Sequence, residues 1–439
     1  MTTGKRMSMN EPIVTVVVPV YNTEKYLHHC LDALSAQTLG DIRVVCVDDG
    51  STDTSGAILD EFANNDSRFE VIHKPNSGYG ASMNRGFAAA TTKYVGIVEP
   101  DDFPAADMLE KLVTLAESTD ADVVKSNYYS HICGQDQAED ELVKNLDENL
   151  PYGTAFAPDE HHRLLRASAS VWSCLYRRQY LVDNNIHFLE TPGASFQDTS
   201  FNLTALMAAK RVALTAEGFL HYRTDNAASS VKSGAKIFYI CDEYERVWNY
   251  LAARPGLYAE FGKDIAAIQF KGYCWNQWRL ARKFREQFFN RFRNEFLGFE
   301  EKGLLEKSLY SDYDWNDLDQ LLHSPNTFFM RACGARGIKR TVIVTVPSDV
   351  SAATFEKFLN ECPSDEEIIV DFPDGASFDI WPIAEKDLRI KVLSEMCPEG
   401  NLDDSDVRGD AVRKVELHES KPSAFAKLFS PISRKFKNR

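Results

Sequence analysis

Short β-branched runs alternate with amphipathic stretches in the first part of this chain. Ile13 to Val18 (IVTVVV) is nearly continuous in β-branched residues, which is typical of a strand buried on both faces of a parallel sheet. Thr23 to Gln37 follows, with apolar residues at helical spacing at Leu27, Cys30, Leu31 and Leu34. This alternation predicts a mostly parallel, Rossmann-like α/β sheet with right-handed crossovers. In such sheets ligands bind beyond the carboxyl ends of the strands.

The same alternation continues toward the middle of the chain. Further strands are predicted at Ile42–Val47, Phe69–His73, Tyr94–Val98, Val123–Asn127 and Val171–Tyr176. Further helices are predicted around residues 58–62 and 108–115, at Ala81–Ala90 and at Thr199–Lys210. Residues 131–168 are charged and irregular, and we expect an insertion over the strand ends. Residues 235–330 are rich in aromatic and basic side chains and predict amphipathic helices.

A second strand–helix pattern begins at Arg340. Residues 341–377 resemble residues 13–51, since both have an apolar strand ending near Pro, a helix, a second strand and an acidic turn with Gly. Leu388 to Leu393 then resembles Phe69 to His73. We interpret this part as a small α/β domain and a truncated copy of the first half of the sheet; a generic βαβ unit is the alternative. The predicted domains are 11–232 (catalytic), 233–335 (helical), 336–420 (small α/β) and 421–439 (basic tail).

Composition restricts the partners and the compartment. The chain has 439 residues and a net charge of −16, which disfavours binding to nucleic acid. The nine cysteines form no CxxC pair, as expected of reduced thiols in a cytoplasm. We expect neither a signal peptide nor a membrane-spanning helix. Residues 421–439 are basic with interspersed apolar side chains, which predicts peripheral contact with the inner face of the cell membrane; a disordered tail is the alternative.

Acidic and polar motifs follow the predicted strands. Val47 to Asp53 reads VDDGSTD, and Glu99 to Asp102 reads EPDD. Pro19 to Asn22 and Lys74 to Gly80 occupy two further strand ends. Carboxylates at neighbouring strand ends suit a Mg²⁺ or Mn²⁺ ion that neutralises a diphosphate. Taken singly, the acids of EPDD would rather predict an Asx turn or a helix N-cap, and DDGSTD alone is commonly a capped turn.

These motifs together resemble glycosyltransferase family 2, the inverting nucleotide-sugar transferases with a GT-A fold. The resemblance rests on PIVTVVVPVYNTEKYLHHCLDALSAQT, VDDGSTD and NSGYGASMNRGFAAATTKYVGIVEPDD. It is dense over residues 11–129 and looser to about residue 232. It implies a nucleotide-binding set in which Asp49 bonds the base, usually uracil. The implied set is Pro19, Tyr21, Asp49, Lys74, Asn76, Gly78 and Gly80, with Asp101 near the ribose and sugar.

The resemblance also implies a metal site and a catalytic base. Asp102 matches the metal ligand of the family's acidic motif, with Asp101 beside it, and His221 is a further candidate ligand. Asp198 in Phe196 to Phe201 (FQDTSF) matches the catalytic base, although Gln197 replaces the usual first acid. Asp198 also resembles an N-cap for the helix expected from Thr199. Arg223, in the loop of residues 221–230, matches a residue that can close on the diphosphate.

The predicted activity is transfer of a sugar, with inversion, from a nucleotide sugar to a hydroxyl. A UDP-sugar is the expected donor, and a cell-surface polysaccharide or lipid-linked glycan is the expected acceptor. Self-association of the chain is left open. One alternative is a nucleotidyltransferase, although PVYNTEKYL after the first strand lacks the expected Gly-rich basic loop. The other alternative is a non-catalytic glycan-binding or assembly module, for which Asp371 to Asp374, without a paired acidic tip, is a candidate.

Overall fold

The computed structural model describes most of the chain. The described residues are 11–133, 138–224, 236–280, 282–325, 328, 340–362, 366–372, 378–380, 383, 390–392 and 411–417. Residues 225–230 of the predicted closing loop, Asp374 and the basic tail lie outside them. The chain forms two compact units, residues 1–268 and 269–439, and each is described by itself.

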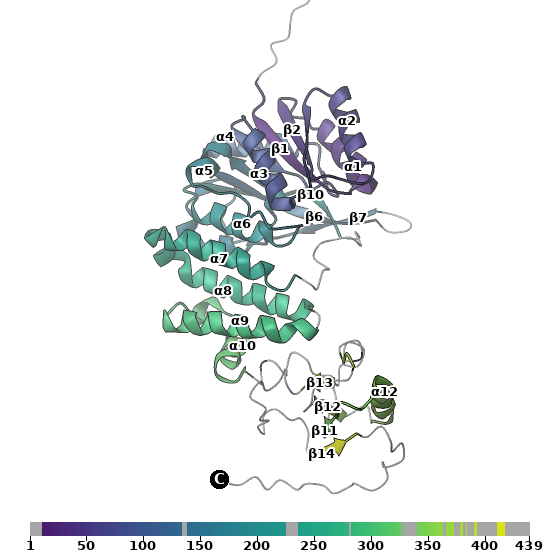
Figure 1. The fold of residues 1–439 in the computed structure, drawn as a ribbon. Coiled ribbons are helices and arrows are strands. Elements are labelled where there is room, and N and C mark those ends of the chain that lie inside the picture. Colours follow the sequence, from purple (N-terminus) through teal and green to yellow (C-terminus); the bar gives the residue numbers. More distant parts are fainter. Residues whose placement is uncertain are drawn as a thin grey trace, which may run out of the picture. The chain divides into compact units, whose positions relative to one another are not determined.

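Four parallel strands form the first half of the main sheet (Figure 1). They are β1 (Val14–Val20), β2 (Ile42–Asp48), β3 (Phe69–His73) and β4 (Tyr94–Ile97). Their order is β3-β2-β1-β4. β1 is buried along its whole length, as its unbroken β-branched run predicts. The carboxyl ends of all four strands therefore meet at one edge of the sheet.

The second half of this sheet is mixed. Its strands are β5 (Phe103–Pro104), β6 (Val123–Cys133), β7 (Ala138–Val143), β8 (Ala155–Phe156), β9 (Cys174–Arg177) and β10 (Val212–Arg223). β10 runs parallel to β6, whereas β9 is antiparallel to both β4 and β6, and β5, β7 and β8 are also antiparallel to their partners. The predicted α/β class is confirmed, but the parallel arrangement holds mainly for β1 to β4.

Helices cover both faces of the first four strands. The helices of the first unit are α1 (Glu24–Ser35), α2 (Ser55–Asn65), α3 (Tyr79–Ala89), α4 (Met108–Thr119), α5 (Arg178–Asp183), α6 (Gln197–Met207) and α7 (Tyr239–Ala252). The apolar faces of α1 and α4 share one buried cluster with Val14, Val16 and Val18. Val17 points the other way, toward Gly86 of α3.

Three sequence expectations need correction. Residues 131–168 are irregular only in part, because β6 runs on to Cys133 and pairs with β7, and short 3₁₀ turns follow at Pro158–Glu160 and His162–Arg166. The strand expected at Val171–Tyr176 begins as a 3₁₀ turn, and β9 starts at Cys174. α6 begins at Gln197, so Asp198 lies in its first turn, and the N-cap is Phe196.

Helices α8 (Pro255–Arg279), α9 (Arg282–Glu301) and α10 (Asp312–His323) follow α7. Within the second unit, Phe270 and Tyr273 of α8 contact Phe292 and Phe296 of α9 at ring-centroid distances of 5.2–6.2 Å. These aromatic residues therefore pack the helices together. None of the helices in the described residues is long and apolar enough to cross a membrane.

The second unit also contains a small parallel sheet. Its elements are β11 (Arg340–Thr345), α12 (Ala352–Glu361), β12 (Glu366–Asp371), β13 (Ile390–Val392) and β14 (Ala411–Glu416). The strand order is β13-β12-β11-β14, and every pair is parallel. Val342 and Val344 of β11 pack with Phe355 and Phe358 of α12 in its core.

Candidate active site

The two aspartates after β2 make different contacts. Asp48 accepts from Ser51 N at 2.9 Å and lies 2.9 Å from His73 Nδ1, so it stabilises the local turn. Asp49 is 4% exposed and turns toward the loop after β3. There Ser77 N donates to one of its oxygens at 2.8 Å and Gly78 N to the other at 2.9 Å.

Asp49 also pairs with the Lys74 ammonium, which joins two of the predicted nucleotide-binding residues. Asn76 is exposed in the same loop, and Tyr21, after β1, is an exposed aromatic side chain at 49%. Pro19 is buried within β1. A carboxylate has about four lone-pair sites, so Asp49 keeps capacity for a ligand N–H after accepting from the loop.

Gly78 and Gly80 are required by packing against the segment that precedes α6. Gly78 has φ +95°, and a Cβ there would lie 2.5 Å from the Thr191 carbonyl oxygen. A Cβ on Gly80 would collide with the Leu189 carbonyl oxygen. Tyr79 N donates to Gly193 O at 3.0 Å. These contacts join the loop after β3 to the segment that carries Asp198.

A group of carboxyls follows β4. Tyr79 donates to Glu99 at 2.7 Å, and burial raises the pKa of Glu99 to about 8. Asp102 is 1% exposed; burial and the neighbouring Asp101 raise its pKa well above the ordinary range. One Asp102 oxygen accepts from Arg223 N at 2.8 Å, whereas Oδ2 is buried and has no hydrogen-bond partner. A buried, orphaned carboxylate oxygen beside other acids fits a divalent cation.

Arg223 and His221 are brought to this region by β10. Arg223 is buried, its Nε donates to the Asp101 carbonyl at 3.1 Å, and its guanidinium lies 4.8 Å from the centre of the Tyr26 ring. His221 lies in a different group of ligand atoms, with His131 and Asp140 rather than with Asp101 or Asp102. Arg223 thus lies against the acidic motif, and His221 faces another set of partners.

Asp198 lies in the first turn of α6, where the helix dipole favours a negative charge. Burial raises its pKa to about 6, and hydrogen bonds involving Thr199 oppose that rise. Gln197 accepts from Ser195 N at 2.5 Å and donates to Thr191 Oγ1 at 2.8 Å. An ionised glutamate at this position could not donate to Thr191. Gln197, which stands where the resembling family has an acid, therefore joins Thr191 to Ser195 in the segment before Asp198.

Two charged residues near Asp198, Glu243 and Lys125, were not predicted from the sequence. Glu243 of α7 is 1% exposed and accepts from Ser200 N at 3.3 Å, and burial raises its pKa to about 8. Lys125 of β6 is fully buried and donates to Ser170 O and Ser170 Oγ, each at 3.0 Å. Lys125 has a sequence signal, because it is a charged residue directly after two valines in a strand, whereas Glu243 stands among the charged residues Asp242, Glu245 and Arg246 and has none.

The carboxyls at the strand ends and on α6 act on one another. The charge of Asp198 raises the pKa of Glu99, after the effects of burial and Asp101, and it also raises that of Glu243. Two surface cavities, of about 410 and 490 Å³, lie elsewhere and contain neither Asp102 nor Asp198. The site is therefore defined by contacts between Asp49, the loop after β3, the EPDD motif and α6.

Part of the chain matches a known protein family. The family model described as glycosyl transferase family 2 matches residues 15–172. The chain carries a family 2 glycosyltransferase domain. The matched residues include the strand-end motifs up to Asp102, and the order β3-β2-β1-β4 agrees with the GT-A fold that family membership implies.

Curated family 2 relatives match about half of the chain or less. The uncharacterized glycosyltransferase EpsJ of Bacillus subtilis is 34% identical over 226 residues, which are 48% of this chain and 61% of EpsJ. The glycosyltransferase GlyG of Streptococcus pneumoniae is 40% identical over 142 residues, 30% of this chain and 47% of GlyG. The crystal structure of S. aureus TarS 1–349 in complex with UDP-GlcNAc is 20% identical, covers 72% of this chain and 83% of that chain, and has a TM-score of 0.46.

Proposed function

We propose that this protein transfers a sugar, with inversion, from a nucleotide-sugar donor to a hydroxyl group. The single observation that carries this proposal is the position of the family's two acidic elements in one connected group. Asp102 follows β4 with an unpartnered buried oxygen, and Asp198 lies in α6 with a raised pKa. Gly78, Tyr79 and Gly80 lie against the backbone of the segment before α6, and the Tyr79 hydroxyl donates to Glu99 of the EPDD motif.

Asp102, with Asp101 beside it, would hold the divalent cation. A bound Mg²⁺ or Mn²⁺ supplies charge neutralisation for the leaving diphosphate. Asp49 is proposed to accept from the N–H of the base, uracil in a UDP-sugar, while the exposed Tyr21 ring contacts its face. Lys74, Asn76, Gly78 and Gly80 form the loop next to the nucleotide. Arg223 contributes positive charge at the Asp102 end of the site.

Asp198 is proposed to act as the general base. Its carboxylate accepts the proton of the acceptor hydroxyl as that oxygen forms a bond to the anomeric carbon. On the opposite side of the sugar, the bond from the anomeric carbon to the diphosphate oxygen breaks, and the electron pair leaves with the nucleoside diphosphate. The products are an inverted glycoside, the diphosphate and a protonated Asp198. A pKa of about 6 leaves the base ionised at neutral pH but basic enough to accept the proton.

The acceptor is proposed to be a cell-surface polysaccharide or a lipid-linked glycan, with the enzyme acting at the cytoplasmic side. Peripheral membrane contact would come from residues 421–439, which contain six basic residues and no acidic residue. No acceptor contact is assigned to a particular residue.

A donor panel tests the proposal without knowledge of the acceptor. Melting temperatures would be measured with UDP-, GDP-, CDP- and dTDP-sugars, each with Mn²⁺ and with chelator, because a ligand that binds the folded state stabilises it. One donor should stabilise the protein only with the metal. Slow donor hydrolysis should then release a nucleoside diphosphate. Formation of a nucleotide sugar with release of pyrophosphate would instead identify a nucleotidyltransferase.

A further inference from the structure

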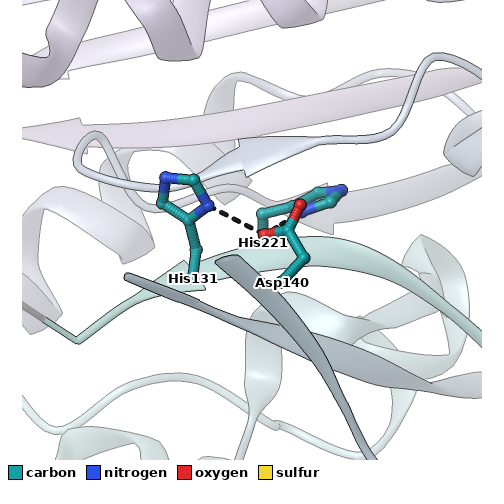
Figure 2. Close-up of side chains that lie close together, drawn as sticks. All are labelled: His131, Asp140 and His221. Atoms are coloured by element: carbon teal, nitrogen blue, oxygen red, sulfur yellow. Dashed lines mark hydrogen bonds and ion pairs between the residues drawn. The ribbon is translucent and has the colours of Figure 1, made fainter. Parts of the chain in front are cut away.

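Two histidines and an aspartate meet on neighbouring strands of the main sheet, next to Phe103, which directly follows the EPDD motif. His131 belongs to β6, Asp140 to β7 and His221 to β10. His131 is directly opposite Asp140 in the antiparallel register, and Tyr129 is opposite His221 in the parallel one. Since side chains alternate along a strand, His131 shares a face with Tyr129 and therefore with His221. Figure 2 shows the three side chains pointing toward one another.

The potential ligand atoms are close together. Asp140 Oδ1 lies 2.8 Å from His131 Nδ1 and 3.0 Å from His221 Nδ1. All three lie within 4.8 Å of one another. His221 Nδ1 is buried and is left without a hydrogen-bond partner, although it lies 3.0 Å from Asp140 Oδ1. A buried ring nitrogen without a hydrogen bond is costly, and a metal ion would remove that cost.

Aromatic packing fixes the orientation of His221. Its ring stacks on Phe103 at a centroid distance of 4.5 Å and an interplanar angle of 7°, and on Tyr129 at 4.9 Å and 16°. The Phe103 ring also meets His131 edge-on at 5.0 Å. Held between two rings, the imidazole keeps Nδ1 directed toward the carboxylate. Such packing around ligands is typical of preorganised metal sites.

Exposure differs among the three residues in a way that leaves room for another ligand. The side chains of His131 and His221 are 6% and 16% exposed, whereas that of Asp140 is 39% exposed. The imidazoles are thus in the interior, and the carboxylate is at the solvent side. Three protein ligands with an open side are the arrangement of metal sites that also bind water or a small ligand.

We propose that His131, Asp140 and His221 bind a divalent transition-metal ion such as Zn²⁺ or Co²⁺. Two imidazoles and a carboxylate select these ions, whereas the all-oxygen group at Asp102 suits Mg²⁺ or Mn²⁺. The ion connects the β6–β7 hairpin to β10, the strand that also supplies Arg223 to the acidic motif. This site needs no nucleotide, which separates it experimentally from the proposed donor site.

Binding of Co²⁺ and Zn²⁺ to the tag-free full-length protein, without nucleotide, tests this inference. Co²⁺ would be followed by visible absorption and Zn²⁺ by calorimetry. One ion should bind per chain at the trio. His221→Phe keeps the aromatic stack but removes the ligand nitrogen, and Asp140→Asn keeps the size of the side chain. Each should weaken binding at least about 10-fold, since loss of even an outer partner typically costs 10–100-fold.

A control variant locates the ion. His162 also pairs with two carboxylates, Asp264 at 2.7 Å and Glu260 at 3.0 Å, so His162→Phe should leave Co²⁺ binding unchanged. Melting curves would verify that every variant is folded, and His131→Phe would replace any that is not. Absence of Co²⁺ and Zn²⁺ binding, or equal affinity in wild type, His221→Phe and Asp140→Asn, would overturn the proposal and leave a hydrogen-bonded His–Asp–His group.

Discussion

The first four strands of the main sheet and the four strands of the small C-terminal sheet have equivalent orders, but the residues that follow the strands differ. β3-β2-β1-β4 and β13-β12-β11-β14 are both wholly parallel, and in both a helix joins the two central strands. β2 and β12 both end in an aspartate, Asp48 and Asp371. Within the part of the chain that the structure describes, only the first sheet continues into a buried second aspartate, Asp49, and into an EPDD motif. The comparison teaches that apolar patterning determines the topology, whereas the residues after the strands determine the chemistry.

We propose that residues 336–420 are a degenerate half-copy of the family 2 fold, retained without the chemistry of the first sheet. Each β-branched strand of the copy still packs on its helix, as Val342, Val344 and Phe355 show. This proposal predicts that the acidic residues of the first unit's site are needed for sugar transfer and that the acidic residues at the strand ends of the second sheet are not.

The largest expected effect is the difference in sugar-transfer rate between the Asp198→Asn and Asp371→Asn variants. Asp198→Asn should lower the rate of sugar transfer by about 10²–10⁴-fold, because proton removal by a positioned base contributes that much. Asp371→Asn is the matched control and should change the rate less than about twofold, since positions away from the site are near neutral. Initial rates with the donor found in the panel would decide. Equal losses in both variants would refute the functional division between the sheets.

The pH dependence of kcat/KM is a second, smaller test of the same base. Burial raises the pKa of Asp198 to about 6, and the carboxylate must be ionised to accept a proton. The rate should therefore be near its plateau at pH 7.5 and fall about tenfold for each unit below pH 6. A profile that is flat from pH 7.5 down to pH 4.5 would rule out a titrating base of this kind.

Substitution of Gly80 tests the contact between the loop after β3 and the segment that precedes α6. Gly80→Ala forces a Cβ against the Leu189 carbonyl oxygen, which should cost about 1–3 kcal/mol of stability and displace the segment before Asp198. Gly40→Ala is the control, since its Cβ would meet nothing within 4 Å. Denaturant melts and transfer rates of both variants would be compared. An unchanged Gly80→Ala protein would show that this contact does not position α6.

The first four strands were predicted well from the sequence, because β-branched runs and helical spacing are local signals, whereas β5, β7, β8 and β10 were not predicted. β3 has the predicted bounds, Phe69–His73, and β2 extends only one residue beyond the prediction. The start of α6 was missed, since it depends on Phe196 at φ +61° and on bonds from the Gln197 side chain. These features depend on tertiary contacts that no local pattern records.

Other parts of the candidate site could not be predicted because they join distant segments. Glu243 reaches Ser200 from a helix that the sequence placed in a separate region. His131 and Asp140 meet through the antiparallel register of β6 and β7, in a stretch whose charge suggested irregular structure. The family motifs predict roles for Asp102 and Asp198, but they do not indicate the groups that change the electrostatic environment of these carboxyls.

The smallest expected effect is the change in stability with pH that is caused by Glu243 of α7. Its folded pKa, about 8, exceeds the ordinary 4.5, so its contribution to stability is complete below pH 4.5 and is lost as pH rises through 8. Glu243→Gln cannot ionise and should be more stable than wild type by about 1 kcal/mol at pH 8.5, with no gain at pH 4.5. Denaturant melts at both pH values measure this. A variant less stable at pH 8.5 would contradict it.

The most direct test of the account is calorimetric titration of the metal-dependent donor into wild-type protein and two variants. The account predicts that Asp102→Asn loses the Mn²⁺-dependent part of donor affinity, whereas Asp198→Asn binds the donor within about threefold of wild type and, in a separate rate measurement, transfers sugar about 10²–10⁴-fold more slowly. Full Mn²⁺-dependent donor binding in Asp102→Asn, together with normal transfer by Asp198→Asn, would contradict the account.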